Sequence, residues 1–375
     1  MSRIHDLIAE HCPNGVAFKR LGDIVRIKNG KDHKSLGEGK FPVYGSGGIM
    51  RYADAYAYNK PSVLIPRKGS LGNLFFVDVP FWTVDTIFYT EIDENQIRPK
   101  YLYYYLTTVG LGDMNQAGGV PSQTQSVLNE LSIPIPCSDN PKKSLEIQAE
   151  IVRILDAFAA LTAELTAELT ARKKQYNHYR DQLLSFEDGE VEWMPLGVIT
   201  TIKTGQSVNK QMISANPGDY PVINSGREPL GFINEWNTEG DPIGITSRGA
   251  GVGSITWQDG KYFRGNLNYS VTIKNHQKVR IRYLYHVLQK MQLEIQALCT
   301  YDGIPALNAG NLKELKVPVP SFAEQERIEI TLNKFDALTN SITEGLPREI
   351  ELRQKQYAYY RDLLLSFPKP EEVAA

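Results

Sequence analysis

Basic and amide side chains recur in this chain beside glycine and proline, as in FPVYGSG (41–47) and PRKGSLGNL (66–74). Arg, Lys, Asn and Gln supply the hydrogen-bond donors that base edges and phosphates of DNA require. Polar loop residues are also commonly just solvated, and among the candidates Arg67 and Arg248 are favoured. The polar and basic side chains with this capacity are Lys28, Asn29, Lys31, Tyr44, Ser46, Arg51, Arg67, Lys68, Gln123, Thr124 and Gln125, then Lys203, Thr204, Gln206, Asn224, Ser225, Arg227, Ser247, Arg248, Asn308 and Asn311.

The motifs of several enzyme classes are absent from the sequence. It has no GxxxxGK(S/T) phosphate loop, no GxSxG nucleophile elbow and no Asn-Pro-Pro-Tyr/Phe of adenine methyltransferases. Asp302 with Glu314-Leu315-Lys316 has the loose D…ExK spacing of a nuclease site. The matching stretch of the first half, Glu130-Leu131-Ser132, lacks the lysine. We therefore expect a chain without catalytic residues or a cofactor of its own.

The composition is that of a globular protein, with 375 residues, 42% of them hydrophobic and 22% charged, and a net charge of −2. This length predicts two domains, and the near-zero charge implies that any DNA binding uses local patches or partner proteins. We expect neither a signal peptide nor a membrane span. Cys12, Cys137 and Cys299 are odd in number, which predicts reduced thiols in a cytoplasm. His5, His11 and Cys12 lack a second ligand pair, so no metal site is predicted.

The whole chain repeats itself. KQYNHYRDQLLSF (174–186) returns as KQYAYYRDLLLSF (355–367), and GGVPSQTQSVLNELSIPIP (118–136) matches DGIPALNAGNLKELKVPVP (302–320). PRKGSLGNL also aligns with SRGAGVGSI (247–255), which superposes Arg67 on Arg248. The order is therefore one globular module and one helical segment, followed by a second copy of each.

Each globular module is predicted to be mixed α/β. Alternating runs such as VRIK (25–28) and SVLIP (62–66) predict strands, and YLYYYL (101–106) predicts a helix whose tyrosines pack in a core. The IPIP (133–136) and VPVP (317–320) runs predict edge strands, because proline cannot sit in a central strand.

The helical segments carry a stripe of apolar residues at spacings of three and four, beginning with Ile147, Ile151 and Leu155. This pattern predicts one helix over 144–187. Its repeat, over 321–367, begins with a Ser321–Glu324 capping box and should break near 345–347, where glycine and proline occur. The acid-rich half of one copy would face the basic half of the other if the helices packed as an antiparallel coiled coil.

These segments resemble the specificity subunit of type I restriction–modification systems. The resemblance is carried by LGDIVRIKNGK (21–31), the Gln-x-x-Ile starts at 148–151 and 325–328, and the ends RKKQYNHYRDQLLSF (172–186) and RQKQYAYYRDLLLSF (353–367). The implied fold class is α+β, with two tandem target-recognition domains separated by two long helices that form an antiparallel coiled coil with pseudo-twofold symmetry. The expected boundaries are 1–143, 144–187, 188–320 and 321–367, with a tail at 368–375.

The resemblance implies a non-catalytic subunit that reads a split, asymmetric sequence in double-stranded DNA, each domain reading one half. It makes the polar and basic loop residues named above the candidate DNA contacts. The helices would dock two methyltransferase (M) subunits, and restriction (R) subunits would join the assembly. AdoMet, ATP and Mg²⁺ would then belong to partner subunits, and no membrane is involved. The expected docking residues are Gln175, Tyr176, Tyr179 and Arg180, then Gln356, Tyr357, Tyr360 and Arg361. Three alternatives remain: a scaffold with two ligand-binding modules that does not bind DNA, a specificity chain without active partners, and an enzyme in its own right.

Overall fold

The computed structural model describes residue 10 and residues 16–115, 120–187, 189–226, 228–301, 303–341 and 344–367. The chain forms two compact units. Unit 1 comprises residues 1–165 and 350–375, and unit 2 comprises residues 166–349. Each unit therefore contains one globular module together with parts of the long helices.

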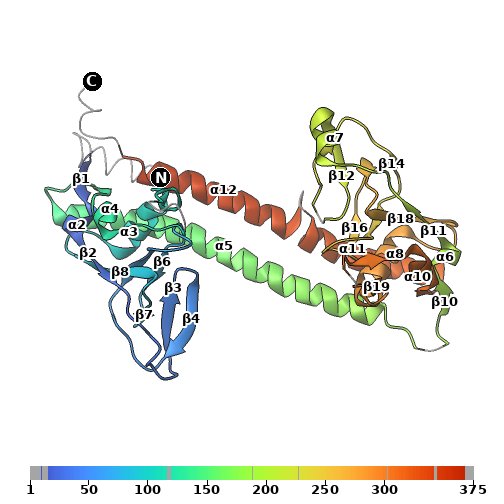
Figure 1. The fold of residues 1–375 in the computed structure, drawn as a ribbon, viewed down its shortest axis with the longest axis horizontal. Coiled ribbons are helices and arrows are strands. Elements are labelled where there is room, and N and C mark those ends of the chain that lie inside the picture. The colour runs from blue at the N-terminus through green and yellow to red at the C-terminus, as the bar shows by residue number, and fades with distance from the viewer. Residues whose placement is uncertain are drawn as a thin grey trace. The chain divides into compact units, whose positions relative to one another are not determined.

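Unit 1 contains a four-stranded sheet in the order β2-β8-β5-β6, a three-stranded sheet β4-β3-β7 and the pair β1-β9 (Figure 1). Its elements are β1 (Ala17–Arg20), α2 (Leu21–Ile24), β2 (Val25–Asn29), β3 (Phe41–Gly45), β4 (Gly48–Ala53), β5 (Ser62–Pro66), β6 (Phe75–Val77), β7 (Trp82–Thr83), β8 (Ile87–Ile92), α3 (Pro99–Leu106), the short 3₁₀ turn Leu111–Asp113, α4 (Gln125–Asn129), β9 (Ser132–Ile135) and the start of α5 (Pro141–Leu183).

Unit 2 repeats this plan, with sheets β11-β18-β15-β16 and β13-β12-β17-β14 and the pairs β10-β21 and β19-β20. Its elements are β10 (Glu192–Pro195), α6 (Leu196–Ile199), β11 (Thr200–Thr204), α7 (Lys210–Ala215), β12 (Pro217–Ile223), β13 (Phe232–Ile233), β14 (Thr238–Glu239), β15 (Ile243–Thr246), β16 (Ile255–Trp257), β17 (Lys261–Arg264), β18 (Asn268–Ile273), α8 (Ile281–Lys290), α9 (Gln292–Ala297), β19 (Cys299–Thr300), β20 (Ala306–Leu307), α10 (Ala309–Glu314), β21 (Lys316–Val319) and α11 (Phe322–Asn340), followed by α12 (Gly345–Leu365).

The strand register corrects one detail of the internal alignment. Lys68 forms an isolated antiparallel bridge with Ser122, and Arg248 forms the same bridge with Ala306. Lys68 is thus the structural counterpart of Arg248, whereas the sequence alignment superposed Arg67 on Arg248. The alignment matched the two arginines by chemical identity, but a register is set by backbone hydrogen bonds, and these shift the pairing by one residue.

Tyr101 and Tyr104 of the YLYYYL helix are confirmed as core residues, and Tyr103 and Tyr105 are half-buried against the same core. Tyr101 has no exposed surface, and its hydroxyl donates to the Pro134 carbonyl oxygen at 3.0 Å. Tyr283, in α8, is 1% exposed and donates to the Pro318 carbonyl oxygen at 3.0 Å. Each ring therefore fixes α3 or α8 against the proline-containing edge strand, because a buried hydroxyl needs a hydrogen-bond partner.

The long helices begin and end where local signals direct them. α5 starts at Pro141, earlier than the expected Ser144, because the Asn140 side chain accepts from the Lys143 amide at 3.2 Å and proline fits the first helical turn. The Ser321 hydroxyl caps α11 by accepting from the Glu324 amide at 3.3 Å, as expected. α11 ends at Asn340 and α12 begins at Gly345, which has a φ of +75°. Ile342, expected in the apolar stripe, lies outside the described residues.

Within each unit, α5 packs on a segment of the second helical region. In unit 1 the Phe158 ring stacks on Tyr360 of α12 at a centroid distance of 5.2 Å, and α12 ends in the core to which Ile147 also belongs. In unit 2 the Tyr179 ring stacks on Phe335 of α11 at 5.4 Å. None of the helices in the described part of the chain is long and apolar enough to cross a membrane.

Candidate nucleic-acid interface

A tight turn between β7 and β8 joins the candidate loops of unit 1. We call it hub turn 1 (Val84–Ile87); it is closed by a hydrogen bond from the Ile87 amide to the Val84 carbonyl oxygen at 3.2 Å. Three backbone hydrogen bonds connect this region to three separate loops: Lys31 N to Thr83 O (2.8 Å), Val84 N to Tyr44 O (3.0 Å) and Arg67 N to Thr86 O (3.0 Å). The turn therefore holds three candidate segments, which are distant in sequence, at one place.

Unit 2 contains the same arrangement between β17 and β18. Hub turn 2 (Gly265–Asn268) is closed by the Asn268 amide donating to the Gly265 carbonyl oxygen at 3.1 Å. The three connections are Gln206 N to Arg264 O (3.0 Å), Gly265 N to Ile223 O (2.8 Å) and Ser247 N to Leu267 O (2.9 Å). Each is the counterpart of a bond in unit 1, so the second set of candidate loops is assembled in the same way.

A fourth segment joins each set through a left-handed glycine. The Gly69 amide donates to Pro121 O at 2.8 Å, and the Gly249 amide donates to Pro305 O at 2.9 Å. These glycines have φ values of +82° and +96°, a region that side-chain-bearing residues rarely adopt. The Gln123–Gln125 segment is thereby brought beside Arg67, as is the stretch before Asn308 beside Arg248.

The candidate DNA contacts differ in exposure. Exposed residues are Asn29, Lys31, Lys68, Thr124, Lys203, Thr204, Gln206, Arg248, Asn308 and Asn311. Half-buried residues are Lys28, Tyr44, Ser46, Arg51, Arg67, Gln125 and Ser225, and buried residues are Gln123, Asn224 and Ser247. Arg227 lies outside the described residues.

Several of the less exposed candidates stabilise the loops themselves. The Gln123 side chain donates to the Pro66 carbonyl oxygen at 2.6 Å, and the Asn224 side chain accepts from the Leu267 amide at 2.9 Å. Arg51 donates to the carbonyl oxygens of Leu36 and Gly37 at 2.8 and 2.9 Å. The Gln123 amide thus satisfies a buried carbonyl oxygen, which would otherwise lose its hydrogen bond with water, and Arg51 and Asn224 connect two segments of their own unit.

Other candidates make one or two contacts within the chain and keep part of their polar side chain at the surface. Gln125 donates to the Asn29 side-chain oxygen at 3.3 Å, and Lys28 pairs with Glu91 at 3.5 Å. The Arg67 guanidinium lies 5.5 Å from the centre of the Phe88 ring. Asn308 caps α10 by accepting from the Gly310 amide at 2.7 Å. An exposed ion pair such as Lys28–Glu91 costs little to exchange for another partner, whereas the Asn308 side chain also stabilises the start of α10.

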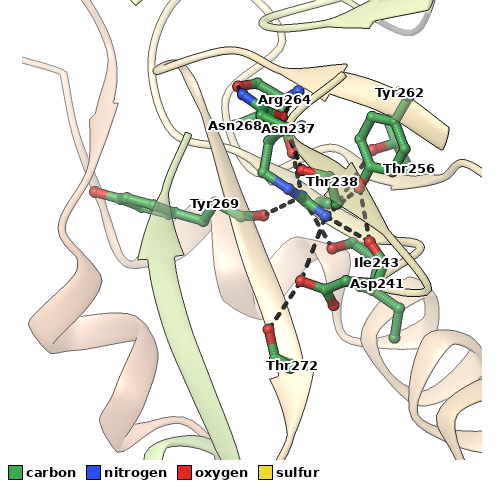
Figure 2. Close-up of polar contacts among 11 residues, drawn as sticks. Asn237, Thr238, Asp241, Ile243, Thr256, Tyr262, Arg264, Asn268, Tyr269 and Thr272 are labelled. Atoms are coloured by element: carbon green, nitrogen blue, oxygen red, sulfur yellow. Dashed lines mark hydrogen bonds and ion pairs between the residues drawn. The ribbon is translucent and has the colours of Figure 1, made fainter. Parts of the chain in front are cut away.

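Arg264, which was not among the candidates from the sequence, is a buried cation of unit 2 with several hydrogen bonds. It is 3% exposed and donates to main-chain oxygens of Asp241 (2.6 Å), Ile243 (3.1 Å) and Tyr269 (3.1 Å), with further bonds to the Asn268 and Tyr262 side chains (Figure 2). Burial lowers the pKa of the Arg264 guanidinium from its usual value. Its carbonyl oxygen holds Gln206, so this cluster anchors hub turn 2 to both sheets.

The counterpart of Arg264 in unit 1 is Thr83. Parallel strand pairing matches Tyr44 with Thr83 in unit 1 and Ile223 with Arg264 in unit 2. Phe81 and Ile87, which flank Thr83 in the sequence, belong to an apolar cluster with Leu64 and Val77, and Tyr58 and Tyr89 pack against this cluster. In unit 2, a cavity of ≈330 Å³ lies beside Arg264 and is also lined by the candidates Lys203, Thr204 and Gln206. The partners of Arg264, such as Asp241 and Ile243, are more than twenty positions away in the sequence, so no local sequence pattern indicates its role.

The two expected docking segments have the same local structure. Arg180 pairs with Asp181 at 3.0 Å and lies 5.7 Å from the centre of the Tyr176 ring. Arg361 pairs with Asp362 at 2.7 Å and lies 6.0 Å from the centre of the Tyr357 ring.

The glutamines of these segments match as well, whereas the tyrosines differ in accessibility. Gln175 accepts from Arg172 at 2.8 Å, and Gln356 accepts from Arg353 at 2.9 Å. Tyr176 is buried, and its hydroxyl donates to Gln289 at 2.8 Å. Tyr179 is exposed on α5, while Tyr360 is half-buried.

One buried glutamine fixes α5 to the first module, and a second buried glutamine fixes α11 to the second module. Gln148 accepts from the Arg98 amide at 2.8 Å and donates to the Gln96 carbonyl oxygen at 3.1 Å. Gln325 accepts from the Arg280 amide at 2.9 Å and donates to the Lys278 carbonyl oxygen at 3.0 Å. These glutamines belong to the two Gln-x-x-Ile sequences, at 148–151 and 325–328. In each unit the glutamine side chain therefore bonds the backbone just before the module's helix, α3 or α8, in the same way.

Comparison with known proteins agrees with this duplicated arrangement. The sequence model of the type I restriction modification DNA specificity domain matches residues 13–172 and again residues 189–352. This chain belongs to that family. A type I restriction enzyme specificity subunit of Escherichia coli is 44% identical over 304 residues, covering 76% of this chain and 75% of that protein. A second such subunit from Escherichia coli is 37% identical over 299 residues, covering 76% and 73%.

Solved structures show the same fold for members of the type I specificity family. The crystal structure of the S subunit from M. genitalium gives a TM-score of 0.67 at 21% identity and covers 94% of this chain and 96% of that one. A chain from a structure on complex assembly and conformational transition of the type I R-M system gives a TM-score of 0.51 at 15% identity and covers 94% of this chain and 97% of that one. The expected α+β class with a tandem internal repeat is confirmed.

Membership of the type I specificity family makes this chain a non-catalytic subunit. Glu314 and Lys316 of the nuclease-like spacing are exposed, and Asp302 lies outside the described residues, as do His5, His11 and Cys12. Within the described ranges, no group of three or more His, Cys, Asp or Glu side chains could hold a metal ion.

Proposed function

We propose that this specificity subunit reads a bipartite, asymmetric sequence in double-stranded DNA, one half with each unit. The carrying observation is that two hub turns assemble the same set of loops by the same backbone hydrogen bonds, while the exposed side chains differ. Two units with equivalent backbones but different exposed side chains are suited to two half-sites of unrelated DNA sequence. Phosphate contacts would position each unit, and exposed amides and cations would read base edges.

The differences between counterparts support an asymmetric site. Lys31 of unit 1 corresponds to Gln206 of unit 2, because their amides donate to equivalent carbonyl oxygens. Arg67 corresponds in the same way to Ser247. A cation in one unit is thus replaced by an uncharged side chain in the other, which changes the base or phosphate that each loop could bind.

We further propose that the repeated helix ends dock two methyltransferase subunits, through which restriction subunits join. Two surfaces with the same Tyr, Arg and Asp arrangement would bind two copies of one partner. Gln175, Tyr179, Arg180, Gln356, Tyr360 and Arg361 would contribute directly, whereas Tyr176 and Tyr357 would support the arginines. AdoMet, ATP and Mg²⁺ would be bound by the partner subunits, and the assembly would act on DNA in the cytoplasm.

The test is a map of methylated bases. The chain is co-expressed with its methyltransferase subunit in a host that lacks adenine methylation, the complex is purified, and N6-methyladenine is located by long-read sequencing. A split motif with unequal halves and an unspecified gap is the expected result. A purified complex that methylates an undivided site would refute the bipartite reading, and failure of the two proteins to co-purify would refute docking and favour a scaffold that does not bind DNA.

A further inference from the structure

Each hub turn presents one exposed polar residue that the sequence reading passed over. Asp85 follows Val84 in hub turn 1, and Asn266 follows Gly265 in hub turn 2, so they occupy the same position of two equivalent turns. Both side chains are exposed. The backbone on either side of each residue is hydrogen-bonded to candidate loops. Asp85 and Asn266 therefore each lie among the candidate loops of their own unit.

The conformation of the turns does not require Asp or Asn at these positions. Among the described residues other than glycine, only Cys137 has a positive φ, so neither Asp85 nor Asn266 is in the left-handed region that favours such side chains. Neither side chain forms a hydrogen bond or ion pair with the described part of the chain. A residue whose polar group serves neither the turn nor its neighbours is available for a ligand.

The surroundings of Asp85 are cationic. The amides of Lys31, Arg67 and Lys68 donate to the carbonyl oxygens of Thr83 and Thr86, which lie on either side of Asp85 in the sequence. Lys31 and Lys68 are exposed and suited to phosphates, from which a carboxylate would be repelled. A carboxylate is favourable in such a surface where it accepts a hydrogen bond from a base amino group, as Asp does from cytosine N4.

We propose that Asp85 and Asn266 are specificity-determining residues, each reading one base at equivalent positions of the two half-sites. Asp85 accepts from the amino group of a cytosine. Asn266 pairs with adenine, since a carboxamide both accepts from adenine N6 and donates to N7, an arrangement a carboxylate cannot make. This inference rests on the proposed DNA-reading function and deepens it, because it assigns a base class to one residue of each unit.

The experiment exchanges the two chemistries. Asp85→Asn and Asn266→Asp are each co-expressed with the methyltransferase subunit, and methylated sites are mapped beside the unchanged protein. Matched controls make the same type of change at the opposite ends of the same strands: Glu94→Gln beyond β8 and Gln277→Glu beyond β18, both at exposed positions. Binding of the purified complexes to site variants differing at the assigned base is measured at fixed salt.

Asp85→Asn is expected to change or relax one position of one half-site, reducing the preference for cytosine there by roughly 10- to 100-fold, the range of one good base contact. Asn266→Asp should do the same for adenine in the other half-site. The remaining positions and the gap should stay as in the unchanged protein, and both controls should retain its motif.

Two results would overturn the assignment while leaving the proposed function intact. One is an unchanged motif with unchanged base preference in both variants, and the other is an equal loss of methylation in a variant and its matched control. If the unchanged protein itself yields no split motif, the proposed function fails and the assignment falls with it. The three results are distinguishable because all proteins are mapped in the same host.

Discussion

Arg248 and Lys68 are single residues at equivalent positions of the two units, and both place an exposed cation beside the candidate loops. Both are exposed, both form the isolated bridge that closes their loop set, and both follow a residue whose amide is bonded to a hub turn. The Arg248 guanidinium makes no ion pair with the described residues. A cation held in place by its backbone but free at its charged end is suited to a phosphate, which is bound through charge rather than sequence.

Replacing Arg248 with Ala is expected to weaken DNA binding by the assembled complex and to lower the salt dependence by about one counterion, without changing the half-site. The measurement is DNA affinity by fluorescence anisotropy across a salt series. Lys274→Ala is the matched control, because it removes one charge just beyond the opposite end of β18. Equal affinities and salt slopes for Arg248→Ala and the unchanged protein would remove Arg248 from the interface.

His286 shows at the element scale how three helices of unit 2 meet. This buried side chain of α8 lies with Nδ1 3.1 Å from the Tyr176 hydroxyl of α5 and Nε2 2.9 Å from the Asn333 side-chain oxygen of α11. The neighbouring Arg282 pairs with Asp336 at 2.5 Å. In unit 1, α3 and α5 instead meet through Tyr104, whose hydroxyl donates to Asp156 at 2.5 Å.

Burial lowers the pKa of the His286 imidazole below its usual value of about 6.5, and Arg282 contributes in the same direction. Since the unfolded chain then binds a proton more readily than the folded one, stability should be full above about pH 6.5 and decrease as the pH falls below it. His286→Tyr, which copies Tyr104, should reduce this loss. We expect a smaller fall in melting temperature between pH 7.5 and 5.5 for that variant than for the unchanged protein.

The control for this measurement is His276→Tyr, at an exposed position of the same unit. It should retain the pH dependence of the unchanged protein, since it leaves the buried His286 and its contacts with α5 and α11 in place. Identical pH profiles for His286→Tyr and the unchanged protein would show that the buried imidazole does not contribute to acid sensitivity.

At the scale of the whole molecule, the two units share α5, and α12 begins in unit 2 and ends in unit 1. α5 carries the buried Gln148 in unit 1 and the Tyr176–Arg180 contact in unit 2. In the second helical region, the buried Gln325 belongs to α11 and the Tyr357–Arg361 contact to α12. Each module is therefore bonded to a helix. In the proposed function, the helices would determine the number of unspecified base pairs between the half-sites, while the modules would determine which bases are read.

Deleting one turn from each helix, residues 162–165 of α5 and 349–352 of α12, is expected to change the gap of the methylated motif and leave both halves unaltered. These segments adjoin the boundaries between the two units. The readout is again the methylation map, and the control replaces the same residues with alanine without changing helix length. Altered half-sites with an unaltered gap would contradict the role of the helices as a spacer.

Much of this architecture could be predicted from local sequence signals. Ser321 followed by Glu324 predicted the start of α11, and the YLYYYL pattern predicted tyrosines in the core, because a cap and an amphipathic face depend on residues a few positions apart. The repeated segments predicted a tandem α+β chain, and the shared Gln-x-x-Ile spacing marked both helix starts. Such features can be recognised in the sequence because their interactions are local or because the segments are repeated along the chain.

The candidate site depended on contacts that no local pattern records. Only the sheet register makes Lys68 the counterpart of Arg248, and only tertiary packing buries Gln123 and Asn224 while leaving Asp85 and Asn266 exposed. The sequence by itself determined the repeat, the helices and the chemical class of the surface. The tertiary structure decided which polar groups stabilise loops and which face solvent, because backbone hydrogen bonds between distant segments set both the register and the burial of each side chain.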